Sequence, residues 1–187
     1  MKVIGVSGMP GSGKGVVSQI AHRMGMRIIR MGDVIRDEAK KRNEDVGKTA
    51  VTLRKEFGDY IVAEKCVEKI KLEQSKADSN VIFMIEGIRS PYELDIFRNN
   101  FNEFIIISVF SNPKTRFKRL KRRKRSDDFS EFSEFQKRDK RELCFGIGEV
   151  IATSDYLIVN EGPLWRFKNQ VKRILRHQNK NVNDETI

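Results

Sequence analysis

The sequence predicts one α/β domain in which a five-stranded parallel sheet carries helices on both faces. Three observations indicate this fold class. Five short strand-like runs alternate with segments of helical spacing, which is the pattern of a doubly wound sheet. The run VIFMIE is apolar almost throughout, as in parallel strands that are covered on both faces. The chain of 187 residues also suits one domain with a sizeable core.

The expected strands and helices follow in order along the chain. The strand-like runs are KVIGVS (2–7), RIIRM (27–31), VIFMIE (81–86), FIIISVF (104–110) and DYLIVN (155–160). Helices are predicted over 14–24, 32–41 and 49–73, the last interrupted at Gly58. The segment SPYE has Ser90 as N-cap, Pro91 at the first helical position and Glu93 to close a capping box, so another helix starts there.

The C-terminal half is predicted to contain three further helices. Asn112-Pro113 opens a basic helix, the polar string SDDFS (126–130) ends it, and a second helix runs to about residue 145. The last helix covers 164–176. The polar tail at 179–187 is expected to be disordered, so the folded domain spans 1–178.

The positive charge of the chain is concentrated in one segment. The formal net charge is +11, and residues 114–141 contain thirteen Lys or Arg against five Asp or Glu. Such a segment indicates a partner that carries several phosphates. A short polyphosphate and a nucleic acid both fit this description.

Composition argues against a membrane protein. The hydrophobic fraction is 39% and the mean hydropathy is -0.53. No apolar run approaches the length of a membrane-spanning helix, and MKVIGVSG leads straight into a strand, so no signal peptide is expected. Cys66 and Cys144 form no CxxC pair, which favours a reduced, cytoplasmic setting in which they pack in the core.

The glycine-rich string GMPGSGKGVV follows the first strand and precedes the first helix. Gly8, Gly13 and Lys14 match the GxxxxGK spacing of a phosphate-binding loop. Glycines let successive backbone N–H groups converge on phosphate oxygens, and the helix adds the positive end of its dipole. Lys14 would supply a charge to the β- and γ-phosphates of ATP. Gly15 stands where most such loops have the hydroxyl that reaches Mg²⁺.

The string GxPGSGKG resembles the loop of adenylate kinases, in which a glycine also follows the lysine. The resemblance implies nucleotide binding by Gly8, Met9, Pro10, Gly11, Ser12, Gly13, Lys14, Gly15 and Val16. It also implies that Mg²⁺ is held largely through water by an acid at the end of a sheet strand, here Glu86 directly after VIFMI. Asp33, after the strand RIIRM, is the alternative acid. Adenylate kinases have a threonine where this chain has Val16.

Two further segments resemble the acceptor site of nucleoside monophosphate kinases. GDVIR (32–36) is similar to the run that opens their acceptor-binding helix, which implies that Arg36 contacts the acceptor phosphate. EGIR (86–89) resembles the DGFPR segment with one residue fewer, and it makes Arg89 a second acceptor-binding candidate. Asp33 is the candidate general base for an acceptor hydroxyl; a phosphate acceptor needs none.

The C-terminal half resembles dephospho-CoA kinase. RLKRRKRSDDFSE followed by QKRDKRE matches that family's basic lid, which we place at about 114–145. A lid that closes over ATP would stabilise the transferring phosphate and exclude water. The candidate lid residues are Arg122, Arg125, Arg138 and Arg141. The catalytic candidates are two of these, Arg125 and Arg138, together with Lys14 and Asp33. SDYLIVNEG (154–162) matches that family's last strand and turn, which implies that Asn160 lies against the adenine.

Residues 1–178 as a whole are identified as a member of an archaeal P-loop family, uncharacterised protein family 0200, related to adenylate kinase and dephospho-CoA kinase. The strings that indicate it are GMPGSGKG, EGIRS, RSDD and GIGEVIA. The resemblance implies ATP and Mg²⁺ as cofactors and a small phosphorylated acceptor, a nucleoside monophosphate or dephospho-CoA. An ATP-dependent switch protein that binds RNA is the alternative, although no aromatic stacking motif accompanies the basic run. The oligomeric state, a preference for ATP over GTP, and a role for Glu149 stay open.

Overall fold

The computed structural model describes residues 1–76, 80–123 and 131–180. Its five strands form one parallel sheet with the order β2-β3-β1-β4-β5. The strands are β1 (Lys2–Ser7), β2 (Arg27–Arg30), β3 (Phe83–Ile88), β4 (Glu103–Phe110) and β5 (Tyr156–Val159). Every residue of β1 is buried, since this strand lies in the middle of the sheet. The predicted fold class is therefore confirmed.

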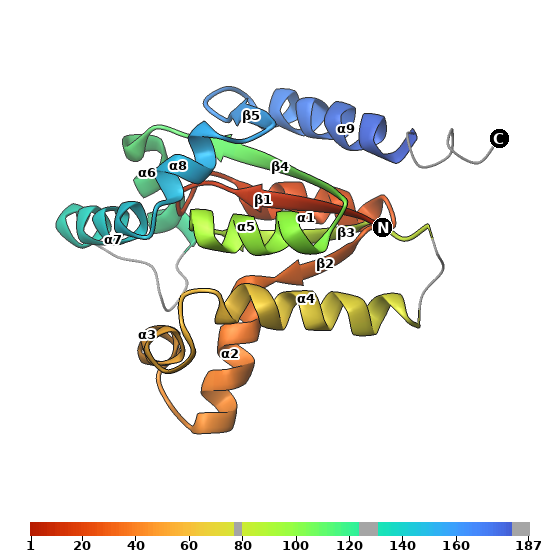
Figure 1. The fold of residues 1–187 in the computed structure, drawn as a ribbon. Coiled ribbons are helices and arrows are strands. Elements are labelled where there is room, and N and C mark those ends of the chain that lie inside the picture. Colours follow the sequence, from red (N-terminus) through yellow and green to blue (C-terminus); the bar gives the residue numbers. More distant parts are fainter. Residues whose placement is uncertain (77–79, 124–130, 181–187) are drawn as a thin grey trace.

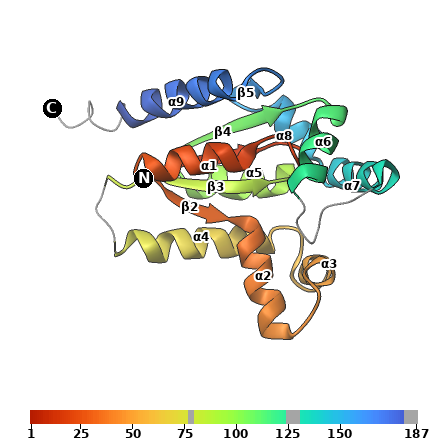
Figure 2. The same cartoon turned by 180° about the vertical axis from the view of Figure 1, so that it is seen from behind.

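Helices cover both faces of this sheet (Figures 1 and 2). One face packs against α1 (Lys14–Arg23) and α9 (Leu164–Lys180), whose apolar side chains share a core with the sheet. The other face packs against α4 (Ile61–Gln74), α5 (Pro91–Asn100) and α8 (Ile147–Ala152). The remaining helices are α2 (Met31–Arg42), α3 (Val46–Phe57), α6 (Pro113–Arg123) and α7 (Phe132–Cys144). Among the described residues, no helix combines the length and the apolar character that a membrane crossing requires.

Local sequence signals explain several helix boundaries. The capping box at the start of α5 is present, with Ser90 Oγ accepting from Glu93 N and the Glu93 carboxylate accepting from Ser90 N. Asp45 caps α3 by accepting from Lys48 N at 3.0 Å, so that helix begins three residues earlier than expected. Gly58, at φ +89°, ends α3 and confirms the predicted interruption.

The third strand and the last helix also end at other residues than predicted. The third strand, predicted over 81–86, covers Phe83–Ile88, because pairing with β1 continues past Glu86 to Ile88. The register shifts between Val6 and Ser7, and Gly87 adopts φ +106°, so Glu86 lies in the strand just before a bulge. The last helix continues to residue 180, so the first two residues of the predicted tail are helical. The predicted break at 126–130 and the tail beyond 180 lie outside the described residues.

Candidate functional site

The glycine-rich turn between β1 and α1 lies at the carboxyl end of the sheet, where the geometry of three positions requires glycine. Gly8, Gly11 and Gly13 have φ values of +139°, +81° and +115°, a region that side chains disfavour. A Cβ atom at Gly8 would lie 2.3 Å from Val109 O, and one at Gly13 would lie 2.4 Å from Asn160 Nδ2. The turn thus packs closely against the end of β4 and the segment after β5.

Polar side chains from α6, from the segment that precedes it and from the segment after β5 brace this loop from outside. Asn160 Nδ2 donates to Ser12 O at 2.7 Å, and Ser111 Oγ donates to the same carbonyl at 3.2 Å. Arg116 Nη1 donates to Pro10 O at 3.2 Å, and Arg119 Nη2 donates to Asn160 O at 2.8 Å. Asn160 therefore supports the phosphate loop directly. Its contact with an adenine stays a prediction.

Arg116 is a buried cation among these bracing groups. Its side chain is 3% exposed, forms a two-point ion pair with Asp139 of α7, and lies over the ring of Phe135 at 5.0 Å. Breaking a buried ion pair on one side leaves the other charge buried alone, which costs about 3 kcal/mol or more. We expect Arg116→Gln to lower the free energy of unfolding by about 3 kcal/mol, measured by urea denaturation.

Lys118→Gln is the matched control for this prediction, because Lys118 is an exposed cation on the same helix. Its effect on the free energy of unfolding should stay within about 0.5 kcal/mol. Equal destabilisation by the two changes would contradict the bracing role of Arg116.

Lys14 lies at the first position of α1, with its ammonium group turned back to the loop. Nζ donates to Gly8 O and, at 3.2 Å, to Met9 O. The pKa of Lys14 is lowered to about 8, mainly because the ammonium is buried. The charges of Arg89 and Arg138 also lower this pKa, whereas those of Glu86 and Glu142 raise it. Four charged side chains from β3, the turn after it and α7 therefore surround the lysine of the phosphate loop.

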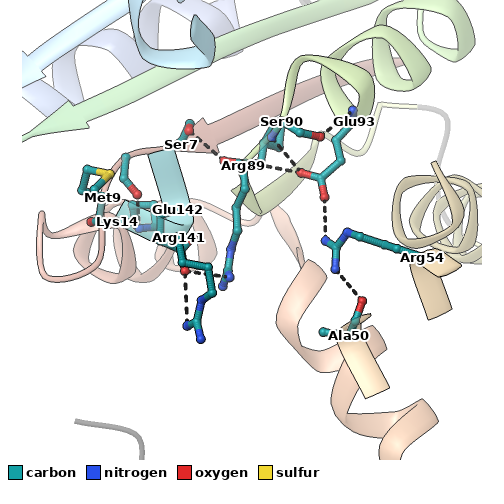
Figure 3. A network of polar contacts seen from close by, with 12 residues as sticks. Ser7, Met9, Lys14, Ala50, Arg54, Arg89, Ser90, Glu93, Arg141 and Glu142 are labelled. Carbon is teal, nitrogen blue, oxygen red and sulfur yellow. Dashed lines mark hydrogen bonds and ion pairs between the residues drawn. The ribbon is translucent and has the colours of Figure 1, made fainter. Parts of the chain in front are cut away.

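Arg89 follows directly after β3, and two buried carboxylates hold it from opposite ends (Figure 3). Its backbone N–H donates to Glu93 Oε2 at 2.7 Å, and its Nη1 donates to Glu142 Oε1 at 3.2 Å. The side chains of Glu93 and Glu142 are 2% and 1% exposed. The contact with Glu142 fixes the direction of the Arg89 guanidinium toward α7.

Glu93 also connects this arginine to α3. Its Oε1 lies 3.3 Å from Nη2 of Arg54, and Arg54 Nη1 donates to Ala50 O at 2.8 Å. Burial raises the pKa of Glu93, and the backbone N–H of Arg89 and the charge of Arg54 oppose this shift. A small cavity of about 100 Å³ opens here, with Arg54, Arg89, Tyr92 and Phe145 among its lining residues.

Glu86 has the surroundings that a water-mediated Mg²⁺ contact requires. Its side chain is 18% exposed, and its Oε2 lies 3.3 Å from Arg30 Nε. The direction of that contact does not satisfy hydrogen-bond geometry, so the buried Oε2 has no hydrogen-bond partner among the described residues. Magnesium keeps several waters, and the partly exposed carboxylate of Glu86 can accept hydrogen bonds from them. The residues present therefore fit the expected ion.

The two remaining acceptor-side candidates, Asp33 and Arg36, lie together in the first turns of α2. Arg36 Nε donates to Asp33 Oδ1 at 3.1 Å, and both side chains are exposed. Arg30 lies 4.0 Å from Asp33 Oδ2 and also contacts Glu86, so one arginine links the candidate base to the candidate metal contact.

The structure places the four lid candidates differently. Arg138 is close enough to Lys14 to lower its pKa, and Arg141 Nη2 lies 3.9 Å from Glu142 Oε1 while remaining exposed. Arg122 is exposed at the end of α6. Arg125 lies outside the described residues.

Sequence reasoning missed six residues of this site. They are Arg30, Arg54, Glu93, Arg116, Arg119 and Glu142, which brace the loop or link its charges. One signal in the sequence could have indicated part of this network. Two acids, Asp139 and Glu142, stand among the cations of α7, and an acid in a basic segment often has a specific partner.

The fold and this site define a P-loop NTPase of the nucleotide-kinase type. A family model described as an AAA domain matches residues 7–136. A UPF0200 protein of Methanothermobacter thermautotrophicus is 64% identical over 176 residues, which cover 94% of this chain and 90% of that protein. The chain belongs to the UPF0200 family.

Solved structures of lower sequence identity share the fold. The protein TT1252 of Thermus thermophilus superimposes with a TM-score of 0.68 at 16% identity, covering 94% of this chain and 97% of that one. Shikimate kinase of Acinetobacter baumannii, solved with shikimate, gives a TM-score of 0.58 at 12% identity, with 97% and 94% covered.

Proposed function

We propose that the protein is an ATP-dependent phosphotransferase that moves the γ-phosphate of ATP to a small nucleotide-like acceptor. The observation that carries the proposal is the group of charges around Lys14, at the carboxyl end of a parallel sheet. Ligands bind at this edge in open α/β folds. Phosphoryl transfer needs positioned positive charge more than it needs a covalent catalyst.

Each part of the site has a function in this proposal. The N–H groups of the loop and the start of α1 bind the phosphates, and Lys14 exchanges its contacts with Gly8 O and Met9 O for phosphate oxygens. Mg²⁺, when bound, would neutralise phosphate charge, and Glu86 would hold it through water. Arg138 approaches from α7 and acts as a lid residue. Part of the basic lid thus faces the phosphate loop, which favours a kinase over a nucleic-acid switch.

We propose that the acceptor binds in the cavity beside Arg89. The cavity that Arg89 and Arg54 line lies beside the charges around Lys14, so an acceptor there would be next to the γ-phosphate. Arg36, exposed on α2, is the second acceptor-binding candidate. We place the reaction in the cytoplasm, in keeping with two cysteines that are both free thiols.

The test is a transfer screen with ATP, Mg²⁺ and single acceptors, read by mass spectrometry of the products. The panel contains the nucleoside monophosphates and dephospho-CoA, and shikimate because a structural neighbour was solved with it. We expect one acceptor to gain a phosphate at a rate that Arg89→Gln lowers about 10-fold or more, since a charged hydrogen bond is lost. Binding of ATP without transfer to any acceptor or water would overturn the kinase proposal.

The affinity for ATP is expected to fall as the pH rises through about 8. In the free protein Lys14 has a pKa of about 8, so it is mainly protonated at neutral pH and loses its charge above that value. Bound phosphates favour the charged form, so ATP binding takes up a proton at higher pH. The affinity should be constant below pH about 7.5 and then fall by up to about tenfold per pH unit.

Calorimetry in buffers of different ionisation enthalpy measures both the affinity and the proton uptake. Lys14→Arg is the matched control, because a guanidinium keeps its charge across this range. Its affinity, whatever its absolute value, should not show the decline. An unchanged wild-type affinity up to pH about 9.5 would contradict the assignment to Lys14.

A further inference from the structure

The two helices that cover one face of the sheet carry no acidic residue. These are α1, with the sequence KGVVSQIAHR, and α9, with the sequence LWRFKNQVKRILRHQNK. Their exposed cations away from the phosphate loop include Arg23, Lys172, Arg173 and Arg176, which we call the α1–α9 surface. No ion pair of these four side chains occurs within the described parts of the chain.

The opposite layer has an ordinary mixture of charges. In α4, Glu64, Glu68 and Glu73 alternate with three lysines, and Arg27 of the neighbouring strand pairs with Glu73 at 3.7 Å. Solvated protein surfaces usually intersperse both signs in this way. The uniform charge is therefore a property of the α1–α9 surface, and solubility alone does not require it.

The α1–α9 surface is separate from the phosphate site. Lys2, the first residue of β1, donates from Nζ to Gln178 O at 2.9 Å, which ties the end of α9 to the amino edge of the sheet. The phosphate loop lies at the carboxyl end of the same strand. Arg176 follows Arg173 by three residues and Lys172 by four, so it lies next to both on one side of the helix.

We infer that the α1–α9 surface binds the phosphate backbone of a nucleic acid without reading its sequence. The apolar side of α9, formed by Phe167, Val171 and Leu175, is buried against the sheet, so the helix cannot insert it into a bilayer. Beyond its first turn, where Leu164 and Trp165 are exposed, the outer side of α9 carries a row of cations, which suits an extended polyanion and its counterion release. This binding goes beyond the proposed phosphotransfer and does not depend on it.

The experiment measures binding of a labelled single-stranded RNA and a DNA duplex, each of about 20 nucleotides or base pairs, by fluorescence anisotropy at about 50 to 200 mM salt. The test variant carries Lys172→Gln, Arg173→Gln and Arg176→Gln. A control of equal charge carries Lys55→Gln, Lys69→Gln and Arg98→Gln, three exposed cations on α3, α4 and α5. A lid control carries Lys114→Gln, Lys118→Gln and Lys121→Gln, all exposed on α6.

We expect the test variant to bind about tenfold or more weakly at the lowest salt and to lose about two units of the slope of log K against log salt. Its circular dichroism and its ATP affinity should match the wild type, and the equal-charge control should bind nucleic acid normally. The RNA and DNA arms show which nucleic acid is preferred.

Three results would overturn the inference. The loss could follow the lid control and not the test variant, or excess ATP could displace the nucleic acid, either of which places binding at the phosphate site. The third is α9-dependent binding to vesicles of phosphatidylserine and phosphatidylcholine with no binding of either nucleic acid. All three results come from binding measurements, so they test this inference even if the protein shows no phosphotransfer activity.

Discussion

Replacing Lys14 by alanine is expected to remove most of the affinity for ATP and all turnover while the fold is retained. Nζ donates to two loop carbonyls in the absence of nucleotide, and the same group would meet the β- and γ-phosphates. Hydrogen bonds to charged groups contribute about 1.5–3 kcal/mol each. Loss of two such contacts predicts an affinity about 100-fold or more lower.

The fold should survive this change because the lysine takes no part in the core. The glycine turn is held from outside by Arg116, Arg119 and Asn160, which the variant leaves in place. Calorimetric titration with ATP gives the affinity, and thermal unfolding without ligand checks the fold. Lys69→Ala, at an exposed site on α4, is the control. Undiminished ATP binding by the Lys14 variant would exclude the phosphate-loop interpretation.

Replacing Glu86 by glutamine is expected to abolish the gain in ATP affinity that Mg²⁺ provides, together with any phosphotransfer. Gly15 and Val16 have no side-chain oxygen, so the loop offers the ion no ligand where a hydroxyl usually stands. Glutamine keeps the shape of the side chain and removes its charge. Metal-free ATP binding should therefore change little, whereas the gain with Mg²⁺ should fall by about 10-fold or more.

The matched variant is Asp33→Asn, because Arg30 contacts both acids. Asp33 is exposed and already paired with Arg36, whereas one oxygen of Glu86 is buried without a hydrogen-bond partner in the described structure. We therefore expect the Asn variant to keep the gain. ATP affinity with and without Mg²⁺ decides between them: if Glu86→Gln keeps the gain and Asp33→Asn loses it, the two acids have exchanged roles.

The sequence by itself determined the fold class and the place of the phosphate loop. Apolar runs bounded by glycine, proline and capping residues are local signals, and the order of strands and helices leaves few topologies for a parallel sheet. The capping box at Ser90 and Glu93 shows how far such a signal extends, since both of its hydrogen bonds join residues three apart. The glycines of the loop were recognisable because their backbone angles exclude other residues.

Only the tertiary structure decided which charges meet. Arg89 and Glu142 are 53 positions apart, and Arg116 reaches Pro10 across 106 positions, so no local spacing connects them. The bulge at Gly87 depends on the pairing of β3 with β1. Because this pairing continues to Ile88, Glu86 lies inside the strand and not at its end. A buried charge needs a partner, but the sequence does not say which of 37 cations that partner is. Packing of separate elements makes that choice, because it brings together side chains that are distant along the chain.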